Sequence, residues 1–362
     1  MTIRPLQRSD LGQVTSLYEH VSRSGSRTPP PGLDRYFEQS FFEQPWADPQ
    51  IPSLVYVDRD EAIVGFIGSS VRPLDFEGET IRMAFSTQLV ADPSVRKRAV
   101  GAFLLKAYLA GPQDMTITDE ASDEVRRMWE GLGGETVHLA CIGWIRPFRP
   151  WIAAAELGAR TRPGLARTLR PIAPALDAAT RVLASRLAPD KPRGTSEELT
   201  PALLVEHLPE VAKGRRLRPA YDESTVGWLL REVEAVKSHG TLVRRLVRHE
   251  TGEVAGWFVY YAKRGGVGQV LQIAAPERTV DPVLDHLFHD AESRGVTALR
   301  GRMEAHLREP LSTRGCYLRR SDAWALIHSS RGDVLHAVHS GRALLTRLEG
   351  GWWMGHHLFP FD

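Results

Sequence analysis

A short basic loop between an apolar run and a helical pattern is the part of this sequence best suited to chemistry. The stretch from Ala84 to Gly111 reads AFSTQLVADPSVRKRAVGAFLLKAYLAG. Because Pro93 cannot continue a strand ladder, the apolar run is expected to end at Asp92. Cations and small side chains follow, namely Arg96, Lys97, Arg98, Ala99, Val100, Gly101 and Ala102. A helix start offers free N–H groups and a positive dipole end, so the loop predicts a seat for a phosphate-bearing ligand.

This loop resembles the coenzyme A pyrophosphate loop of the GNAT (N-acetyltransferase) superfamily. The family pattern is Gln or Arg, two residues, Gly, one residue, then Gly or Ala. Here it is Arg96-x-x-Ala99-x-Gly101, so the first glycine has become alanine. The resemblance extends over most of residues 1–148. The hairpin VYVDRDEAIVGFIGSSV is similar to the family's central ribbon, and SDEVRRMWEGLGG is similar to the stretch written N-x-x-A-x-x-L-Y-E-K-L-G-F.

The resemblance implies specific roles for the residues around the loop. A backbone N–H at a bulge in the fourth strand, around Leu89 or Val90, is expected to polarise the thioester carbonyl. Trp129 stands against the expected cofactor, where the family usually has a tyrosine that protonates the leaving thiolate. An indole cannot do that chemistry. Water or another group would then protonate the thiolate, or the enzyme relies on proximity and polarisation.

The general base is the least defined part of the expected site. The family often uses a carboxylate on or near the fourth strand, but the sequence has no acid between Glu79 and Asp92. Asp119 or Glu120, just beyond the next strand, is the predicted base, and the competing role for such acids is to solvate a helix N-terminus. A water-relayed base through Gln88 is equally admissible.

The elements that must position these residues follow from hydrophobic periodicity. Helices are expected from Leu11 and from Leu33, the second carrying aromatic residues that pack as core or line an acceptor pocket. The predicted strands of residues 1–150 are Thr2–Leu6, Ser53–Val57, Ala62–Val71, Thr80–Val90, Gln113–Thr118 and 137–145, the last completing the domain.

The second half repeats the order of the first. Residues 151–198 form an Ala/Arg/Pro-rich helical linker, expected to lie against the body, although a basic amphipathic piece might also touch a membrane or an acidic carrier. From 199 to 362 the pattern restarts, with LVRRLVRHETGEVAGWFVYYA echoing the first hairpin, but AAPERTVDP replaces the phosphate loop. The fold class is therefore α/β (α+β): two GNAT-like mixed β-sheets flanked by helices in a tandem duplication, the second copy degenerate.

Composition restricts the remaining possibilities. The chain is 42% hydrophobic and 25% charged, with a net charge of +2, as in an ordinary globular protein. No membrane-length apolar run or signal-type N-terminus is present, so a cytoplasmic location is expected. The two cysteines form no CxxC, and the histidines near the end fit no standard site, so no metal is expected.

Three hypotheses follow for function. The first is an N-acyltransferase that moves an acetyl or longer acyl group from coenzyme A directly to a small-molecule or peptide amine. The second is a related transferase whose donor is an acyl carrier protein or an aminoacyl-tRNA, although the CoA-like loop argues against a nucleic-acid partner. The third is a non-catalytic acyl-CoA-binding module.

Overall fold

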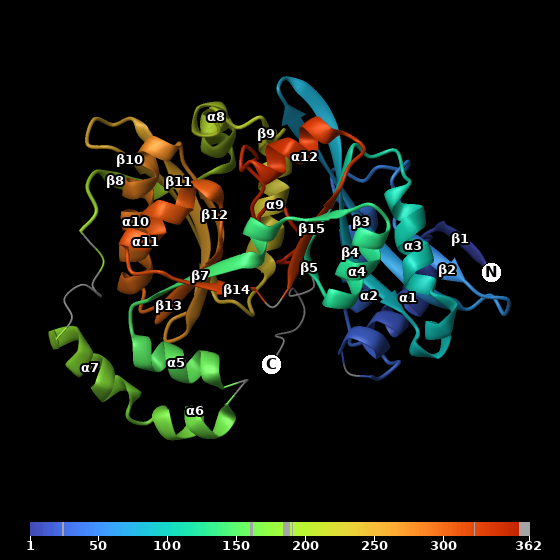
Figure 1. Cartoon of the computed structure of the whole chain (residues 1–362), viewed down its shortest axis with the longest axis horizontal. Coiled ribbons are helices and arrows are strands. Elements are labelled where there is room, and N and C mark those ends of the chain that lie inside the picture. The colour runs from blue at the N-terminus through green and yellow to red at the C-terminus, as the bar shows by residue number, and fades with distance from the viewer. Residues whose placement is uncertain (24, 160–161, 184–188, 190, 322, 355–362) are drawn as a thin grey trace.

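The computed structural model describes residues 1–23, 25–159, 162–183, 189, 191–321 and 323–354, with only the backbone described for 96–98 and 181–183. Two mixed β-sheets stand side by side, and helices cover them (Figure 1). Among the described residues, no helix is both long and apolar enough to span a bilayer.

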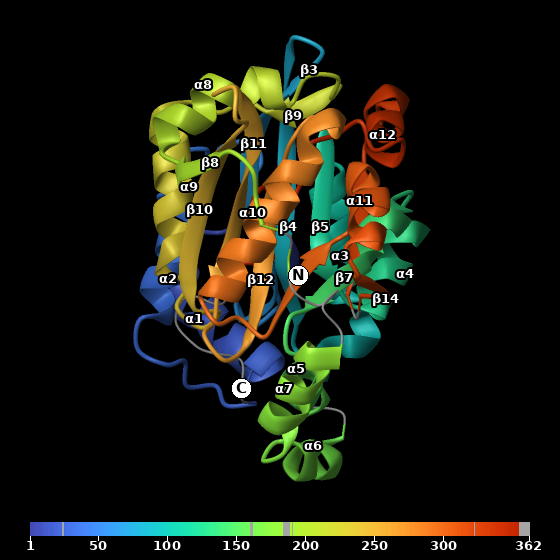
Figure 2. The same ribbon diagram turned by 90° about the vertical axis from the view of Figure 1, so that its left-hand side faces the viewer.

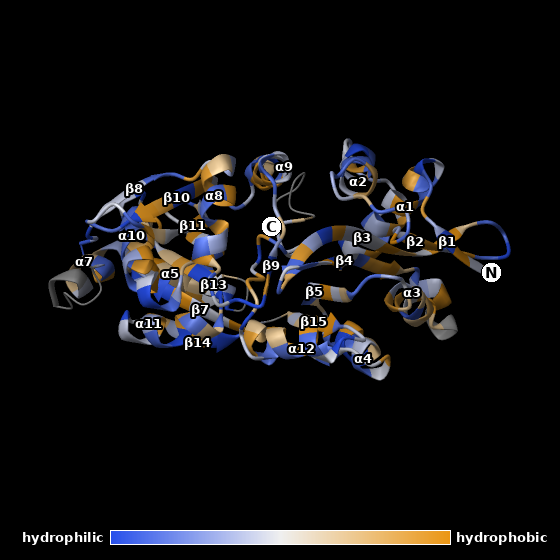
Figure 3. Ribbon diagram, turned by 90° about the horizontal axis from the view of Figure 1, so that it is seen from above, coloured by the Kyte–Doolittle hydropathy of each residue, from blue (hydrophilic) through white to orange (hydrophobic). Residues whose placement is uncertain are grey.

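The first sheet has the order β1-β2-β3-β4-β5-β15-β6. Its strands are β1 (Thr2–Pro5), β2 (Leu54–Val57), β3 (Ile63–Phe76), β4 (Glu79–Ala91), β5 (Met115–Ala121), β15 (Trp324–His328) and β6 (Glu135–Thr136). Only β4 and β5 pair in parallel along this path, and β9 (Leu217–Pro219) adds to the far end of β3. Helices α1 (Leu11–Tyr18) and α2 (Leu33–Phe42) cover one face, whereas α3 (Val100–Leu109) and α4 (Asp123–Gly131) cover the other (Figure 3).

The second sheet has the order β14-β7-β13-β12-β11-β10-β8, again with one parallel pair, β12 with β13. Its strands are β14 (Tyr317–Arg320), β7 (Ile142–Pro147), β13 (Ala298–Arg302), β12 (Val267–Ala274), β11 (Val254–Ala262), β10 (Thr241–Arg248) and β8 (Thr195–Glu198). Its helices are α8 (Pro201–Val211), α9 (Glu223–Ala235), α10 (Val280–Ser293) and α11 (Arg308–Thr313), and α12 (Gly332–His339) follows β15. The element order repeats, so the predicted two-sheet α/β fold is confirmed.

The two halves exchange strands between their sheets. Strand β7, from the first half of the chain, lies between β13 and β14 of the second sheet. Strand β15, from the second half, lies between β5 and β6 of the first. The expectation that 137–145 completes the first domain is therefore wrong. Its β propensity fits either sheet, and only long-range pairing decides which sheet it joins.

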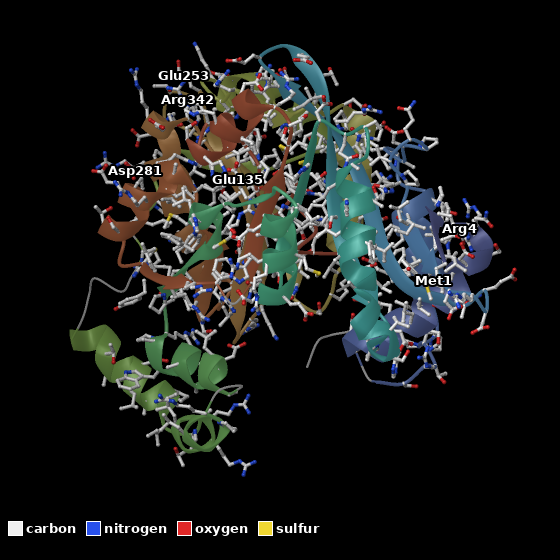
Figure 4. The ribbon with its side chains drawn as sticks, turned by 45° about the vertical axis from the view of Figure 1, so that its right-hand side comes forward. Met1, Arg4, Glu135, Glu253, Asp281 and Arg342 are labelled. Carbon is white, nitrogen blue, oxygen red and sulfur yellow. The ribbon has the colours of Figure 1, made fainter. Side chains whose placement is uncertain are left out.

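A buried indole and an ion pair connect the exchanged strands to their neighbours. Trp144 on β7 is fully buried, and its Nε1 donates to the Arg302 carbonyl of β13 at 3.1 Å. His339 of α12 lies 2.7 Å from Glu135 of β6, a further tie near the junction of the halves, where Figure 4 labels Glu135. The halves are thus one interlocked structure.

Candidate acyl-coenzyme A site

Strands β4 and β5 separate part-way along their length. Their parallel pairs are Met83 with Met115, Ala84 with Thr116 and Phe85 with Ile117. Beyond these pairs β4 continues to Ala91 and β5 to Ala121, but the two no longer pair. The splay leaves a gap between strands inside the sheet, where an extended ligand can use main-chain groups that no strand satisfies.

A bulge in β4 lies beside this gap. On β3, Phe66 pairs with Val90 and Gly68 with Thr87, so Gln88 and Leu89 both stand opposite Ile67. Gln88 has a φ of 53°, in the left-handed region that disfavours a residue with a side chain. Of the two predicted N–H donors, Leu89 is part of the bulge and Val90 directly follows it. Bulges turn backbone groups out of the ladder, which is what a polarising donor needs.

The side chain of Gln88 is the clearest sign of a ligand. Both its amide nitrogen and its amide oxygen are buried, and neither has a hydrogen-bond partner among the described residues. A buried polar group without a partner costs about 1–3 kcal/mol. Together with the backbone strain, this cost marks the bulge as a place arranged for binding rather than for stability.

The predicted phosphate seat begins with the 3-10 segment Pro93–Arg98 and the residue Ala99. Ala99 has a φ of 52° and starts α3, where Phe103 N–H is the first to bond back, to the Ala99 carbonyl at 3.1 Å. The N–H groups of Val100, Gly101 and Ala102 therefore have no acceptor within the helix. Among the side chains that the structure describes, a Cβ placed on Gly101 would meet only Met128, at 3.9 Å, so these leave the helix start open.

Alanine replaces the family's glycine at the left-handed residue of this turn. A residue with a Cβ in this left-handed conformation costs about 1 kcal/mol relative to glycine. The side chains of Arg96, Lys97 and Arg98 lie outside the described part of the chain, and their part in binding stays a prediction.

Asp92 holds the beginning of the loop. Its carboxylate accepts from the Ser94 N–H at 2.9 Å and pairs with Arg27 from the loop between α1 and α2. Burial alone would raise the pKa of Asp92, but the Ser94 and Arg27 hydrogen bonds outweigh it and lower the pKa to about 2. Asp92 is thus a fixed anion that shapes the turn.

The two predicted bases, Asp119 and Glu120, lie at the free end of β5 in different surroundings. The Asp119 side chain is only 5% exposed and lies 3.9 Å from Arg302. Burial raises its pKa, and the guanidinium groups of Arg302 and Arg347 offset the rise only in part. The N–H groups of Gly351 and Trp352 also approach, although neither carboxylate oxygen has a partner at full hydrogen-bond geometry.

Glu120 keeps solvent-exposed surface. The protein that surrounds it, together with the Asp119 charge, raises its pKa to about 7, and Arg347 and Arg302 counteract the rise. The side chain of Glu120 therefore meets both protein and solvent. Of the two carboxyl groups, Glu120 is the one that can exchange a proton with a ligand near neutral pH.

Solved structures share the fold of this chain at low sequence identity. A conserved protein of Enterococcus faecalis, named a probable N-acyltransferase, is 12% identical, with 93% of this chain and 73% of that chain covered and a TM-score of 0.59. A GCN5-related N-acetyltransferase from Kribbella flavida is 14% identical over 90% of this chain and 70% of that chain, with a TM-score of 0.56. The chain has a GNAT fold in two copies. No protein-family model and no curated relative matches it.

The Saccharomyces cerevisiae N-myristoyltransferase, solved with bound myristoyl-CoA and inhibitors, is a further similar structure. It is 9% identical, with 90% of this chain and 79% of that chain covered and a TM-score of 0.52. At such identities the likeness establishes the GNAT fold alone.

Within this GNAT fold the second copy provides an internal control for Gln88. Counted from the last parallel pair, Gln88 is three residues after Phe85 of β4, and Gln272 is three residues after Gln269 of β12. The Gln272 amide oxygen accepts from Trp257 Nε1 at 2.7 Å, and its nitrogen donates to Glu349 at 2.9 Å. The protein itself satisfies the second amide, whereas the first lacks a partner. The geometry supports a ligand site in the first copy only.

The segment around Glu349 closes one side of the splay. Glu349 is fully buried and accepts from Tyr221 at 3.0 Å, from Gln272, and from the Thr346 N–H at 2.8 Å. A Cβ on Gly350 would lie 2.1 Å from the Asp119 carboxylate, and one on Gly351 would lie 2.0 Å from the Phe85 ring. Because neither Gly350 nor Gly351 has a side chain, the backbone can pack directly against β4 and β5 where their pairing ends.

This segment was not predicted as part of the site. The sequence does suggest that the aromatic stretch from Glu349 could dock over a cleft, but packing on its own domain is the simpler expectation. In the structure the stretch packs on both halves: Gly350 and Gly351 contact the first sheet, whereas Trp353 packs in the core of the second. The glycine pair was the available signal. Residues 355–362 of the stretch lie outside the described part.

Trp129 packs deep in the first domain. It has no exposed surface, and its Nε1 donates to the Ile327 carbonyl of β15 at 3.0 Å. The single polar hydrogen of the indole is therefore already used, which leaves none for a ligand. Ser122, which replaces the family's asparagine, caps α4 by accepting from the Val125 N–H at 3.3 Å.

A largely apolar pocket of about 370 Å³ lies near α2, and its lining includes Ser69 and Val71 of β3, which pair with Ser86 and Ala84 of β4. Phe41 and Phe42 line it together with Ile51 and Val71. Tyr36 and Phe37 are buried in the core, whereas Phe41, also buried, and Phe42 contribute to the pocket lining, so each of the two expected roles is seen. Among the described residues, no group of three or more His, Cys, Asp or Glu side chains is placed to hold a metal ion.

Proposed function

We propose that the protein is an N-acyltransferase that moves an acetyl or longer acyl group from coenzyme A to an amine acceptor in its first copy. The observation that carries the proposal is the unpaired, buried Gln88 amide at the bulge beside the splay of β4 and β5. In the second copy, both polar atoms of the Gln272 amide are hydrogen-bonded within the protein, so the fold can satisfy the equivalent glutamine without a ligand.

The described residues fit an acyl-CoA co-substrate. The N–H groups of Val100, Gly101 and Ala102 suit the diphosphate, because a helix start with an open glycine binds anions. The gap between β4 and β5 suits the extended pantetheine arm. When bound, the thioester supplies an activated acyl carbon, and the N–H groups at Leu89 or Val90 are the proposed donors to its carbonyl oxygen.

The proposed step is direct transfer. The acceptor nitrogen forms a bond to the acyl carbon while the carbon–sulfur bond breaks, and coenzyme A leaves as the thiolate. Glu120 takes the proton that the nitrogen loses, directly or through a water held by Gln88, since its pKa of about 7 is suited to that exchange. Water protonates the thiolate, because the Trp129 indole has no proton to give.

Asp119 then has an electrostatic role. Its position beneath Gly350 and beside Arg302 shields it from an acceptor, and its charge contributes to the raised pKa of Glu120. Removing this charge should lower the pKa of Glu120, so the two predicted bases act as a base and its modulator.

The test is free-thiol release from a series of acyl-CoAs with a panel of amines. Activity in the wild-type chain, lost in Gln88→Ala and retained in a folded Glu61→Ala control on the distant β2–β3 turn, supports the proposal. Binding of acyl-CoA without thiol release for any amine would support a binding module instead. Transfer only from an acylated carrier protein or a charged tRNA would assign a different donor.

A further inference from the structure

Three short helices form a unit beside the second sheet. They are α5 (Pro150–Gly158), α6 (Pro163–Leu169) and α7 (Ala173–Leu183), and α5 packs against both others. Ala153 of α5 lies in a small core with Val267 and Ala298 of the second sheet. The buried Asp177 of α7 accepts from the N–H groups of Trp151 and Ile152 at 2.9 and 3.1 Å. The unit is therefore anchored through α5, and α6 carries none of that anchoring.

The surface of α6 is both apolar and basic. Leu165 is 60% exposed and Ile172, just after the helix, is 54% exposed. Arg162, Arg167 and Arg170 are exposed among them. The sequence contains no Asp or Glu from Leu157 to Leu176, so the stretch itself carries positive charge only, with Glu156 and Asp177 as the nearest acids on either side.

Cations continue from α6 onto the body. Arg170 lines a hollow of about 250 Å³ together with Lys263 and Arg264 of the turn after β11, where Glu156 is the one acid among the lining residues. Exposed apolar side chains framed by arginines are typical of elements that lie in the interface of an anionic membrane.

The shape of the molecule favours a flat partner. In Figures 1 and 2, α6 lies at the lower extremity of the structure, below both sheets. A planar surface can reach it without meeting the rest of the protein. The exposed side chains stand on a convex helix, which suits a bilayer better than a folded protein that would need a complementary groove.

We propose that α6, with Arg162, Leu165, Arg167, Arg170 and Ile172, is a docking surface for an anionic lipid bilayer. Leucine and isoleucine insert at the headgroup boundary while the arginines bind lipid phosphates. The surface acts as a peripheral anchor, and it is independent of the proposed transfer reaction.

The expected loss of vesicle binding can be calculated from the charges and the leucine. Each Lys or Arg near an anionic surface contributes about fivefold in partitioning, so removing two should weaken binding by about thirtyfold. Removing a leucine that inserts fully should cost roughly tenfold or more. Both effects should be far smaller on neutral lipid.

The test uses the full chain and sedimentation with vesicles. Vesicles of phosphatidylcholine with about one third phosphatidylglycerol are compared with pure phosphatidylcholine at low and high salt. We expect binding to the anionic vesicles that falls with salt, and that weakens about thirtyfold in the double variant Arg167→Ser, Arg170→Ser and tenfold in Leu165→Ser. The matched controls are Arg59→Ser on the β2–β3 turn and Leu318→Ser on β14, whose side chain is 50% exposed.

The proposal would be overturned if the control variants lost vesicle binding to the same extent, or if the wild-type chain did not bind anionic vesicles. Salt-sensitive binding to an acidic carrier protein or to tRNA, without vesicle binding, would assign the surface to that macromolecule instead. Thermal unfolding of each variant separates lost docking from lost folding. Because α6 takes no part in anchoring its unit, the variants are expected to unfold at the wild-type temperature.

Discussion

The two equivalent glutamines should respond to the same substitution in opposite ways. In Gln88→Met, two buried polar atoms without partners disappear, while an unbranched side chain of similar length remains. Each unpaired buried group costs about 1–3 kcal/mol, so the free energy of unfolding should stay equal or rise by about 1–3 kcal/mol. In Gln272→Met, the bonds to Trp257 and Glu349 are lost, and a buried indole N–H remains without an acceptor. That loss should lower the free energy of unfolding by about 2–5 kcal/mol.

Urea unfolding followed by both circular dichroism and tryptophan fluorescence measures the difference. Gln88→Met should combine unchanged or higher stability with a large loss of thiol release from acetyl-CoA, since the site loses its polar group. The pair of variants provides its own control, because both replace a glutamine three residues beyond the parallel pairing. Equal destabilisation by the two would refute the reasoning, since Gln88 would then have partners inside the protein.

Three further outcomes follow from the site. Glu120→Gln should abolish the rise of kcat with pH near pH 7, because the base acts when deprotonated. Because the pKa of Glu120 is raised to about 7, the contribution of Glu120 to the free energy of unfolding declines from about pH 4.5 to about pH 7, and the variant should lose this decline. An unchanged pH–rate profile would assign the proton to another group. Gly351→Ala should lower the free energy of unfolding by about 1–3 kcal/mol, because its Cβ would lie 2.0 Å from the Phe85 ring. In the control Gly332→Ala, the new Cβ has nothing within 4 Å and should cause no clash. Equal unfolding midpoints for the two variants would contradict the close packing of Gly351. Ala99→Gly should leave the free energy of unfolding unchanged or raise it by up to about 1 kcal/mol, because glycine adopts the left-handed conformation of residue 99 without strain. In the control Ala102→Gly, a glycine inside helix α3 should lower the free energy of unfolding by a similar amount. Destabilisation by Ala99→Gly would argue against the left-handed turn.

The sequence predicted the parts of the fold that depend on local pattern. The turn at Pro93 and the start of α3 follow from residue types within a few positions, whereas the bulge near Leu89 is what the resemblance to the GNAT superfamily implies, and the structure has each of them. Strand exchange could not be predicted in this way. Residues 142–147 have the same β propensity in either sheet, and the choice depends on burial of Trp144 against β13, over 150 residues away.

The proposed site residues show the same limit of local pattern. Gln88 is a candidate from its position on the fourth strand, and Asp119 and Glu120 from their position just beyond the fifth, but only the folded structure separates the enclosed Asp119 from the solvent-exposed Glu120. The closure by Gly350 and Gly351 brings a segment more than 200 residues away in sequence against Phe85 and Asp119. Two adjacent glycines signal a close approach, but not to which surface.

The central claim is that coenzyme A binds to the helix start at Val100–Ala102 and to no equivalent place in the second copy. Isothermal titration of the chain with acetyl-CoA tests it most directly. The account predicts one site per chain, abolished by Gly101→Glu, which places a negative charge on the seat, and unaffected by Arg278→Glu beside the corresponding helix α10. Two sites, no binding by several acyl-CoAs, or binding that survives Gly101→Glu would contradict it.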